Sequence, residues 1–361
     1  MHFDRFMRQV RAWVALVTAA LGGCQSTEDP TALNGRPASA VGITVEELVA
    51  PGAWSYASDV NSSGEAVGTY DGGCGGRMPA FWDASGSFTA LPLPAGFCGG
   101  SADAISESGY IAGTLVDGTT RQVARWIPGA TGYAPEYIGV GPRGGTVEPH
   151  GIDDQGNLIG YEFGDGLPMA PVYWSSPSGW SQLRMATGST SCTASALSRT
   201  GAVSGNCYFN SISSAVYWPG VLGDPVVLPR LAGQNSHHTA RGINGAGTLV
   251  GTASNQARNT VSTVPVSWSL VGGNWQVASL TILGGPSEAN DIDEAGNIVG
   301  YSTAKGGKQT AVVWLGGTSI TSLPGLSSKG SGSALAVAPT GRIAVGQSVR
   351  GGNNRATRWW F

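Results

Sequence analysis

Only 12% of the 361 residues are charged, the formal net charge is −3, and the chain contains 57 glycines and 12 tryptophans. Lysine and arginine form no cluster along it. Because a protein that binds a phosphate backbone needs a basic surface, this composition argues against a nucleic-acid partner. The abundance of glycine and the scarcity of charge favour a turn-rich β protein.

Residues 1–23 have the layout of a secretory signal peptide: three arginines, then the apolar stretch 12–21. That stretch is too short to cross a bilayer as a helix, which takes about 20 residues. The segment Leu-Gly-Gly-Cys at 21–24 resembles the bacterial lipoprotein signal, in which the cysteine is lipidated and becomes the first residue of the mature protein. We therefore expect lipidation of Cys24. The alternative is an ordinary signal peptide with an incidental cysteine.

The residues after Cys24 indicate where such a lipoprotein would reside. In Gram-negative lipoproteins, an aspartate directly after the lipidated cysteine resembles a signal for retention in the inner membrane. This chain has Gln25 at that position, which favours the outer membrane. Acyl chains contribute about 0.8 kcal/mol per buried CH₂, so two or three chains anchor a protein stably. Residues 24–41 are polar, contain proline and are interpreted as a lipidated cysteine with a flexible tether. We expect a lipid-anchored protein of the cell envelope, with the membrane as a partner, on the periplasmic or the surface side.

From residue 55 onward one pattern recurs seven times, at intervals of about 46 residues. An isoleucine or valine precedes most of the turns, which usually begin with Asn, Asp or Ser and always contain a glycine. An apolar pair and often a second glycine follow. The turn glycines are Gly64, Gly109, Gly156, Gly201, Gly247, Gly296 and Gly341. Each repeat then reaches a tryptophan: Trp82, Trp126, Trp174, Trp218, Trp268, Trp314 and Trp359. A period of this length is typical of propeller blades.

Each turn is predicted to join two antiparallel strands, because Asx and Ser side chains bond the nearby backbone and the glycine permits a three-residue hairpin with a bulge. A third strand ends at the tryptophan and a short fourth strand follows. Residues 42–361 are therefore predicted to form an all-β, seven-bladed propeller. The last repeat stops at its tryptophan strand, 357–361, whereas 43–49 form an unmatched strand. We predict that this N-terminal strand completes the last blade and closes the ring.

Residues 281–302 and 310–314 carry a family resemblance. They resemble the bacterial extracellular repeat known as the HAF family, after its His-Ala-Phe triplet, and the resemblance extends over about 55–361 in seven degenerate copies. Here the triplet is replaced, for example by Pro79-Ala80-Phe81, which argues against any role that depends on its histidine. The resemblance implies secretion and a propeller-like fold, and it names no catalytic residue.

After Cys24 four cysteines remain, and an even number in an exported chain favours disulfides. Three pairings are possible. Cys192 and Cys207 flank one turn almost symmetrically, and Cys74 and Cys98 fall in two loops expected on one face. We predict the pairs Cys74–Cys98 and Cys192–Cys207. Free or metal-binding thiols are the alternative, which the absence of a Cys-x-x-Cys spacing disfavours.

Motifs of known chemistry are missing. The chain has no nucleophile elbow, HExxH, P-loop or dinucleotide-binding turn, so we predict no catalytic residue, no cofactor and no metal site. The adjacent His237 and His238 are interpreted as solvated loop residues. Residues 290–297 partly mimic a calcium loop but lack its third acid and closing glutamate, and turn formation explains their aspartates.

One register of the repeat is mostly polar. The positions six residues before the turn glycines are Ser58, Asp103, His150, Ser195, Arg241, Asn290 and Leu335. If the first strand of each repeat is innermost, the six polar side chains form a ring at one mouth of a central channel and bind a ligand there. We expect this mouth to be the one that carries both disulfides and the longest loops. The alternative is ordinary strand-end polarity facing solvent.

Three functions compete. We favour a non-catalytic ligand-binding or protein-interaction module, with a polar or anionic glycan or an envelope protein as partner. The second hypothesis is a glycan hydrolase or lyase that uses Asp103, His150 and Arg241. The third is a structural component of an envelope assembly, which would expose an apolar patch. Paired acids would favour an enzyme, and the ring contains only one. The fold alone does not decide, because propellers host all three functions.

Overall fold

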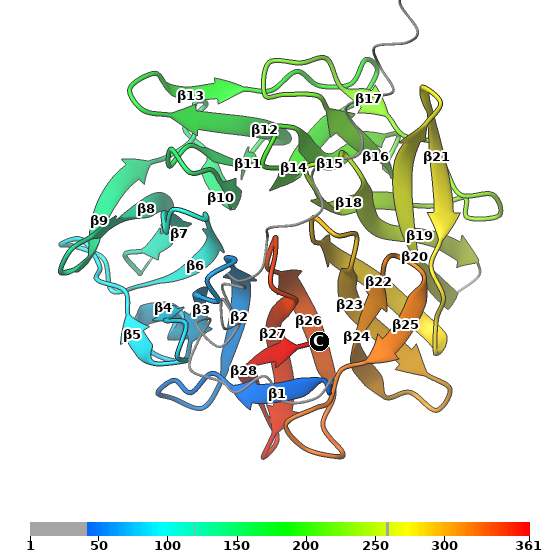
Figure 1. Ribbon diagram of the computed structural model, residues 1–361. Helices are drawn as coiled ribbons and strands as arrows, with labels where there is room; N and C mark the ends of the chain where they lie inside the picture. The colour runs from blue at the N-terminus through cyan, green and yellow to red at the C-terminus, as the bar shows by residue number, and fades with distance from the viewer. Residues whose placement is uncertain (1–41, 119, 258–259) are drawn as a thin grey trace, which may run out of the picture. The chain divides into compact units, whose positions relative to one another are not determined.

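The computed structural model describes residues 42–118, 120–257 and 260–361. The predicted signal peptide, Cys24 and the tether lie outside them. The described residues form seven four-stranded antiparallel sheets arranged around a common centre, with the first strand of each sheet innermost (Figure 1). The fold is a seven-bladed β-propeller, as predicted.

The first four blades follow one another along the chain. Blade one contains β2 (Ser55–Val60), β3 (Ala66–Tyr70), a 3-10 turn η2 (Cys74–Gly76), β4 (Met78–Trp82) and β5 (Phe88–Ala90). Blade two contains β6 (Gly99–Ile105), β7 (Ile111–Val116), β8 (Arg121–Gly129) and β9 (Gly132–Gly139). Blade three contains β10 (Thr146–Ile152), β11 (Leu158–Gly164), β12 (Leu167–Ser175) and β13 (Gly179–Gln182). Blade four contains β14 (Ser191–Leu197), β15 (Val203–Phe209), β16 (Ile212–Trp218) and β17 (Val226–Val227).

The remaining blades complete the ring. Blade five contains β18 (His238–Ile243), β19 (Leu249–Ala257), β20 (Thr260–Val271) and β21 (Asn274–Ser279). Blade six contains β22 (Gly284–Ile292), β23 (Ile298–Ala304), β24 (Gln309–Leu315) and β25 (Ser319–Ser322). Blade seven contains β26 (Gly332–Val337), β27 (Ile343–Arg350) and β28 (Asn353–Trp360), and takes its fourth strand, β1 (Thr44–Glu47), from the other end of the chain.

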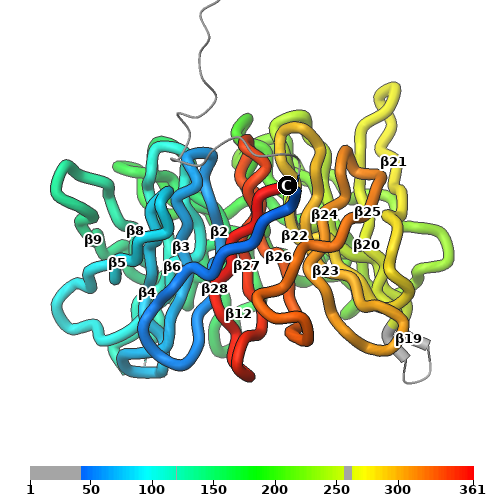
Figure 2. The backbone as a smooth tube through the Cα atoms, turned by 60° about the horizontal axis from the view of Figure 1, so that its bottom comes forward, coloured from blue at the N-terminus to red at the C-terminus, as the bar shows by residue number. Residues whose placement is uncertain are grey.

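The N-terminal strand closes the ring. β1 lies antiparallel to β28 and is its outer neighbour, with Val45 opposite Trp359 (Figures 1 and 2). Beside the strand pairing, the guanidinium of the buried Arg358 lies 2.9 Å from the Glu46 carboxylate and donates to the carbonyl of Gly64 in blade one. The two ends of the chain therefore share one blade, and this blade also bonds to the next.

Six of the seven repeat tryptophans are fully buried. Each indole N–H donates to a carbonyl two residues beyond the fourth strand of the preceding blade, over 2.7–2.9 Å; the acceptors are Val49, Pro92, Arg184, Pro229, Thr281 and Pro324. Blade three is the exception. Its Trp174 is only partly buried, and the Arg125 guanidinium lies 4.6 Å from its ring centroid.

The turns between the first and second strands have the predicted geometry in six blades. In blade one, for example, Asn61 N–H donates to Glu65 O over 3.0 Å, and Gly64 closes the turn with a φ of 86°. Blade seven differs because Ala338 replaces the Asx or Ser. Its loop is one residue longer, with Ala338 N–H donating to Ile343 O, and Arg342 adopts a φ of 55°.

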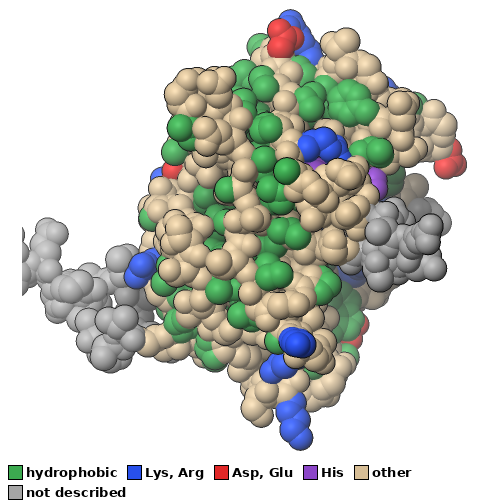
Figure 3. Space-filling model, turned by 90° about the vertical axis from the view of Figure 1, so that its right-hand side faces the viewer, with side chains coloured by type: hydrophobic (Ala, Val, Ile, Leu, Met, Phe, Trp, Pro, Cys, Tyr) green, Lys and Arg blue, Asp and Glu red, His purple; other side chains and the backbone are tan. Residues whose placement is uncertain are grey.

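Both predicted disulfides are present. Cys192 and Cys207 lie directly opposite each other on β14 and β15, and Cys74 is bonded to Cys98. Two disulfides are typical of a protein that resides outside the cytosol. Within the described residues, no helix has the length and apolar character needed to cross a bilayer. On the side of the ring over β21, hydrophobic side chains are scattered among polar ones and charges are sparse (Figure 3).

Candidate functional site

Every innermost strand carries a β-bulge, and the bulged residue is the one in the polar register. In blade two, Ala102 pairs with Gly113 and Ala104 pairs with Ala112, which leaves Asp103 unpaired. The same shift leaves one residue unpaired in each of the other innermost strands: Ser58, His150, Ser195, Arg241, Asn290 and Leu335. A bulge bends its strand and redirects the extra side chain, so the seven register positions share one orientation for a structural reason.

The second glycine of the repeat makes room for the bulge. Gly113 lies opposite the residue before Asp103, and a Cβ at Gly113 would lie 2.0 Å from the carbonyl oxygen of Ser101. Gly205 in blade four has the same 2.0 Å separation from the Thr193 carbonyl oxygen. Only glycine fits there without displacing the inner strand. The recurring glycine after the apolar pair is therefore the sequence signal for the bulge.

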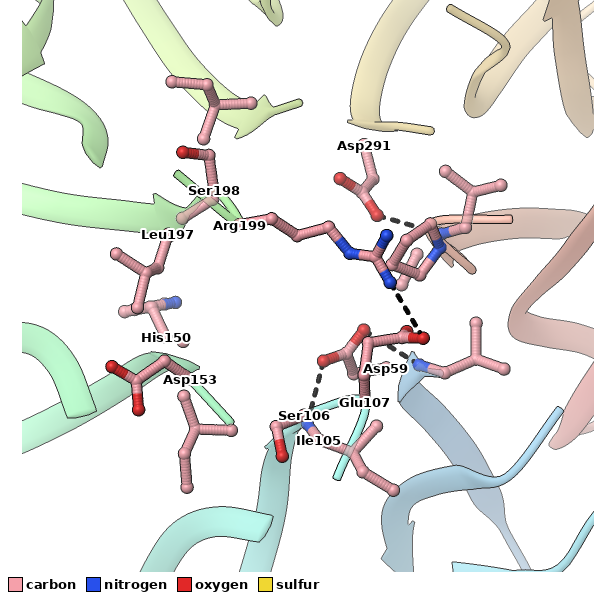
Figure 4. A pocket seen from close by; sticks show the side chains of 18 of the residues that line it. Asp59, Ile105, Ser106, Glu107, His150, Asp153, Leu197, Ser198, Arg199 and Asp291 are labelled. Atoms are coloured by element: carbon pink, nitrogen blue, oxygen red, sulfur yellow. Dashed lines mark hydrogen bonds and ion pairs between the residues drawn. The ribbon is translucent and has the colours of Figure 1, made fainter. Parts of the chain in front are cut away.

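All seven bulged residues line one central cavity of about 850 Å³. The innermost strands of all seven blades contribute to its wall, and the turns between first and second strands surround its opening. We call the end of the propeller formed by these turns the turn face. Figure 4 shows side chains of several blades converging on the cavity, among them His150, Asp291 and Arg199.

The expected position of the disulfides relative to this cavity is wrong. Cys98 directly precedes β6 and Cys74 follows β3, so their disulfide lies at the end of the blades away from the turn face. The bridge between Cys192, at the start of β14, and Cys207 lies at that end too. The linkers into the first strands also arrive there. The cavity therefore opens between short hairpin turns, away from both disulfides.

The register residues differ in how they are held. The Asp103 carboxylate accepts a 3.0 Å hydrogen bond from the Ser101 hydroxyl, and Arg241 is paired with Glu288 over 2.8 Å. The His150 ring is stacked on Tyr161 with 5.5 Å between centroids. The Asn290 amide donates to the Ala334 carbonyl of blade seven, and Ser195 accepts from Asn206. The cavity thus brings Asp103, His150 and Arg241 together, whereas Asn290 bridges two blades.

Two aspartates that the sequence analysis missed also line the cavity. Asp59 and Asp291 follow the bulges of blades one and six. Asp59 accepts the amide N–H groups of Val60 and, across the blade interface, Ile105; Asp291 accepts those of Ile292 and Val337. Each carboxylate therefore links its own blade to the next one through a hydrogen bond. The signal in the sequence is an aspartate where the other repeats have glycine or alanine.

Enclosure by the cavity wall shifts several pKa values. Desolvation raises the pKa of Asp59 to about 6, against the lowering effect of the two amides. It raises the pKa of Asp291 to about 7, with the charge of Asp59 adding to the effect. The pKa of Asp103 is raised to about 7 by desolvation, reinforced by the Glu148 carboxylate. Desolvation lowers the pKa of His150, so its imidazole is neutral at pH 7.

Neighbouring turns are bonded to one another at five of the seven blade junctions. The Ser62 amide donates to Glu107, the Ser108 amide to Asp154, and the Gly245 amide to Glu294. The Glu294 amide donates to the Pro339 carbonyl, and the Thr340 amide donates to the Ser62 hydroxyl. Arg199 of the blade-four turn reaches across the opening instead, and its guanidinium lies 3.0 Å from the Glu107 carboxylate of blade two (Figure 4).

The acids of the cavity do not form a metal site. Among the residues that the structure describes, no group of three or more His, Cys, Asp or Glu side chains is arranged to hold a metal ion. The carboxylates are instead distributed around the ring, and several of them accept backbone amides. The arrangement suits the binding of a small molecule by several separated polar groups.

Several solved structures share this architecture. Virginiamycin B lyase from Staphylococcus aureus superposes with a TM-score of 0.53 and 10% identity, over 89% of this chain and 99% of that one. Puromycin hydrolase has a TM-score of 0.52 and 12% identity, over 83% of this chain and 51% of the hydrolase. For a prolyl endopeptidase the TM-score is 0.52 and the identity 9%, over 85% and 50% of the two chains.

At such identities the likeness extends to the fold alone, and the names of these proteins describe different activities: a lyase, a hydrolase and an endopeptidase. No family model matches the chain, and no curated protein matches it.

Proposed function

We propose that this protein is an exported, lipid-anchored β-propeller that binds a small polar ligand in its central cavity and catalyses no reaction. The observation that carries the proposal is the convergence of seven bulged residues, one from each blade, on a single cavity of about 850 Å³. Sites for small molecules usually enclose about 300–1,000 Å³. A bulge repeated at this position in all seven innermost strands supports a wall shaped for a ligand.

The charge of the wall argues for a neutral or cationic ligand. Seven carboxyl groups line the cavity, against the two arginines Arg199 and Arg241. The raised pKa values of Asp59, Asp103 and Asp291 leave these three partly protonated near pH 7, but the other four still outnumber the arginines. An anionic glycan, which the register residues alone suggested, would meet this negative potential and be repelled. The polar ligand that fits is therefore a neutral saccharide or an organic cation.

Catalysis remains the second candidate because of one residue. Asp103, with a pKa of about 7, is suited to donate or accept a proton near neutral pH. A glycosidase needs a second, free carboxyl group. Asp59 and Asp291 do not supply it, because each already accepts two backbone amides. A protein that only binds a ligand needs the polar cavity alone, whereas a glycosidase also needs the second free carboxyl group.

The envelope location rests on the sequence. Residues 1–24 resemble a lipoprotein signal, the repeats resemble the HAF family, and the two disulfides agree with export. A contact with an envelope protein has support of its own at the outer edge of blade four, where Leu222 is 78% exposed beside Val226 and Val227. That surface is separate from the cavity.

The test of the binding proposal uses the mature protein and a variant with Asp103, His150 and Arg241 all replaced by alanine. Neutral oligosaccharides and small organic cations are titrated calorimetrically against both. We expect a ligand of one class to bind the wild type and to lose at least ten-fold in affinity with the variant, while the melting temperature changes by a few degrees at most. Equal affinity for both proteins, or no binding to either, would overturn the proposal.

A further inference from the structure

Arg199 places a guanidinium over the opening of an acidic cavity. Its turn belongs to blade four, but its partner Glu107 belongs to blade two, so the side chain crosses the opening past blade three. In Figure 4 it extends between Glu107 and Asp291. A ligand that enters from the turn face meets this side chain first.

The contact with Glu107 can open without disturbing the fold. Among the described residues, the blade-four turn makes no backbone hydrogen bond to a neighbouring turn. The Arg199 side chain has one ion-pair partner outside its turn, Glu107. The Arg199 side chain is 46% exposed, and an exposed ion pair contributes little net stability. Glu107, by contrast, is held in place because its other oxygen accepts the Ser62 amide over 2.9 Å.

Three other carboxylates of the cavity, those of Asp59, Asp153 and Asp291, already accept two or more donors. Glu294 accepts one amide, that of Gly245, with both oxygens. In the part of the chain that the structure describes, Asp103 accepts only the Ser101 hydroxyl, and it lies on the same blade as Glu107. Glu107 at the opening therefore has capacity for a further donor once Arg199 leaves it, and Asp103, deeper in the wall, has capacity beside its hydroxyl donor. Asp154, in the turn next to Glu107, likewise accepts a single amide.

We propose that the Arg199 side chain fills the opening of the cavity when no ligand is bound. The ligand is then an organic cation whose guanidinium or primary amine takes the place of Arg199 as the ion-pair partner of Glu107. The inference rests on the proposed function of the cavity and assigns its ligand class. The geometry already shows that Glu107 binds a guanidinium, and the net acidity of the wall favours any second positive group that reaches Asp103. Arg199 therefore competes with the ligand and keeps the empty cavity covered.

Agmatine is a suitable probe, because it carries a guanidinium and a primary amine. It is titrated calorimetrically into the mature protein, into Arg199→Ala, and into the control Arg184→Ala, which removes an exposed arginine far from the cavity. We expect Arg199→Ala to bind about five-fold more tightly than wild type, as for a site whose open form is about a fifth of the population. Arg184→Ala should match wild type, and Glu107→Gln should lose most of the affinity.

The outcomes separate the inference from the proposed function. Equal agmatine affinity of wild type and Arg199→Ala, or tighter binding of glucuronate than of agmatine, would refute the inference. If a neutral oligosaccharide binds and depends on Asp103, His150 and Arg241, while agmatine binds no variant, the cavity is a ligand site of another class. If no probe binds any variant, both proposals fail.

Discussion

Glycines opposite the bulges decide the shape of the cavity at the level of single residues. In the second strand of a blade, glycine lets the bulged inner strand approach to a distance at which any side chain would collide with a carbonyl oxygen. In blades two and four the same glycine also lies against the buried tryptophan, since a Cβ at Gly113 or Gly205 would lie 2.9 Å from the ring of Trp126 or Trp218. Core packing and cavity lining therefore depend on the same position.

Replacing Gly205 by alanine should destabilise the protein by about 1–3 kcal/mol, because the added methyl group overpacks a contact between two backbones and an indole. Gly220→Ala in the same blade is the matched control, since a Cβ there meets open space. Urea denaturation of both variants measures the difference. A Gly205→Ala protein as stable as Gly220→Ala would show that the bulge does not require glycine.

Asp291 links stability to pH. Its folded pKa of about 7 lies above its ordinary value of 3.8, so the folded state binds its proton more tightly than the unfolded state does. Its contribution to stability is therefore fully present below about pH 4 and is lost as the pH rises through 7. His150 and His238, with lowered pKa values, act in the opposite sense below pH 6.5, so a variant must be compared with wild type.

Between pH 8 and pH 5, the wild type should gain about 1–2 kcal/mol relative to Asp291→Asn. Each pKa unit corresponds to about 1.4 kcal/mol, and solvent in the cavity screens part of the effect. Thermal unfolding of both proteins across this range measures it. Asp224→Asn, at an exposed position on the outer rim, should follow the wild type. A stability difference that is independent of pH would contradict the assignment of Asp291.

At the level of elements, the ring is closed by a strand from the far end of the chain. β1 pairs with β28 through four residue pairs, and Leu48 N–H donates to Ala356 O just beyond them. Arg350 and Arg358 of blade seven are paired with Glu47 and Glu46. Without β1, the edge of β28 and the adjoining apolar side chains would be exposed.

Deletion of residues 42–50 should therefore abolish the cooperative thermal transition or lower its midpoint sharply. Removal of residues 25–38, which leaves β1 intact, should leave the transition unchanged. Circular dichroism melting of the two truncated proteins makes the comparison. If both melt like the full mature chain, β1 does not contribute to the stability of the ring.

At the level of the whole molecule, the binding site belongs to the ring and to no single blade. Each blade contributes one bulged residue, and the contacts of Asp59, Asp291 and the turns join neighbouring blades. Most of these contacts link residues about 46 positions apart, whereas Thr340 and Ser62 connect the last blade to the first. A cavity built in this way requires the blades to hold fixed positions. A lipid on Cys24 would also determine where the protein resides, because it would hold the propeller and its cavity at a membrane surface.

Cys24→Ala should remove the protein from the membrane fraction and block its maturation, since the apolar stretch 12–21 is too short to anchor it in place of the lipid. Fractionation of cells that produce wild type or variant measures the distribution. Equal membrane association of the two proteins would argue against a lipid anchor at this cysteine.

The sequence by itself determined the features that depend on local chemistry and on periodicity. Turn residues such as Asn61 and Gly64 specify their hairpins, the repeat length specifies blades, and the unmatched strand at 43–49 requires a partner at the other end of the chain. The pairing of Cys192 with Cys207 follows from their symmetry about one hairpin. Each of these could be predicted because the interacting groups lie within one repeat, or because one strand was left over.

Only the tertiary structure decided how the repeats face one another. The bulges determine that Asp103, His150 and Arg241 line one cavity, and the course of the inner strands places its opening at the face away from the disulfides. Asp59, Asp291 and the Arg199–Glu107 contact act between blades, at distances set by the curvature of the ring. No spacing within the sequence encodes which residues of separate blades meet around the axis, because that depends on the number and tilt of the blades as packed.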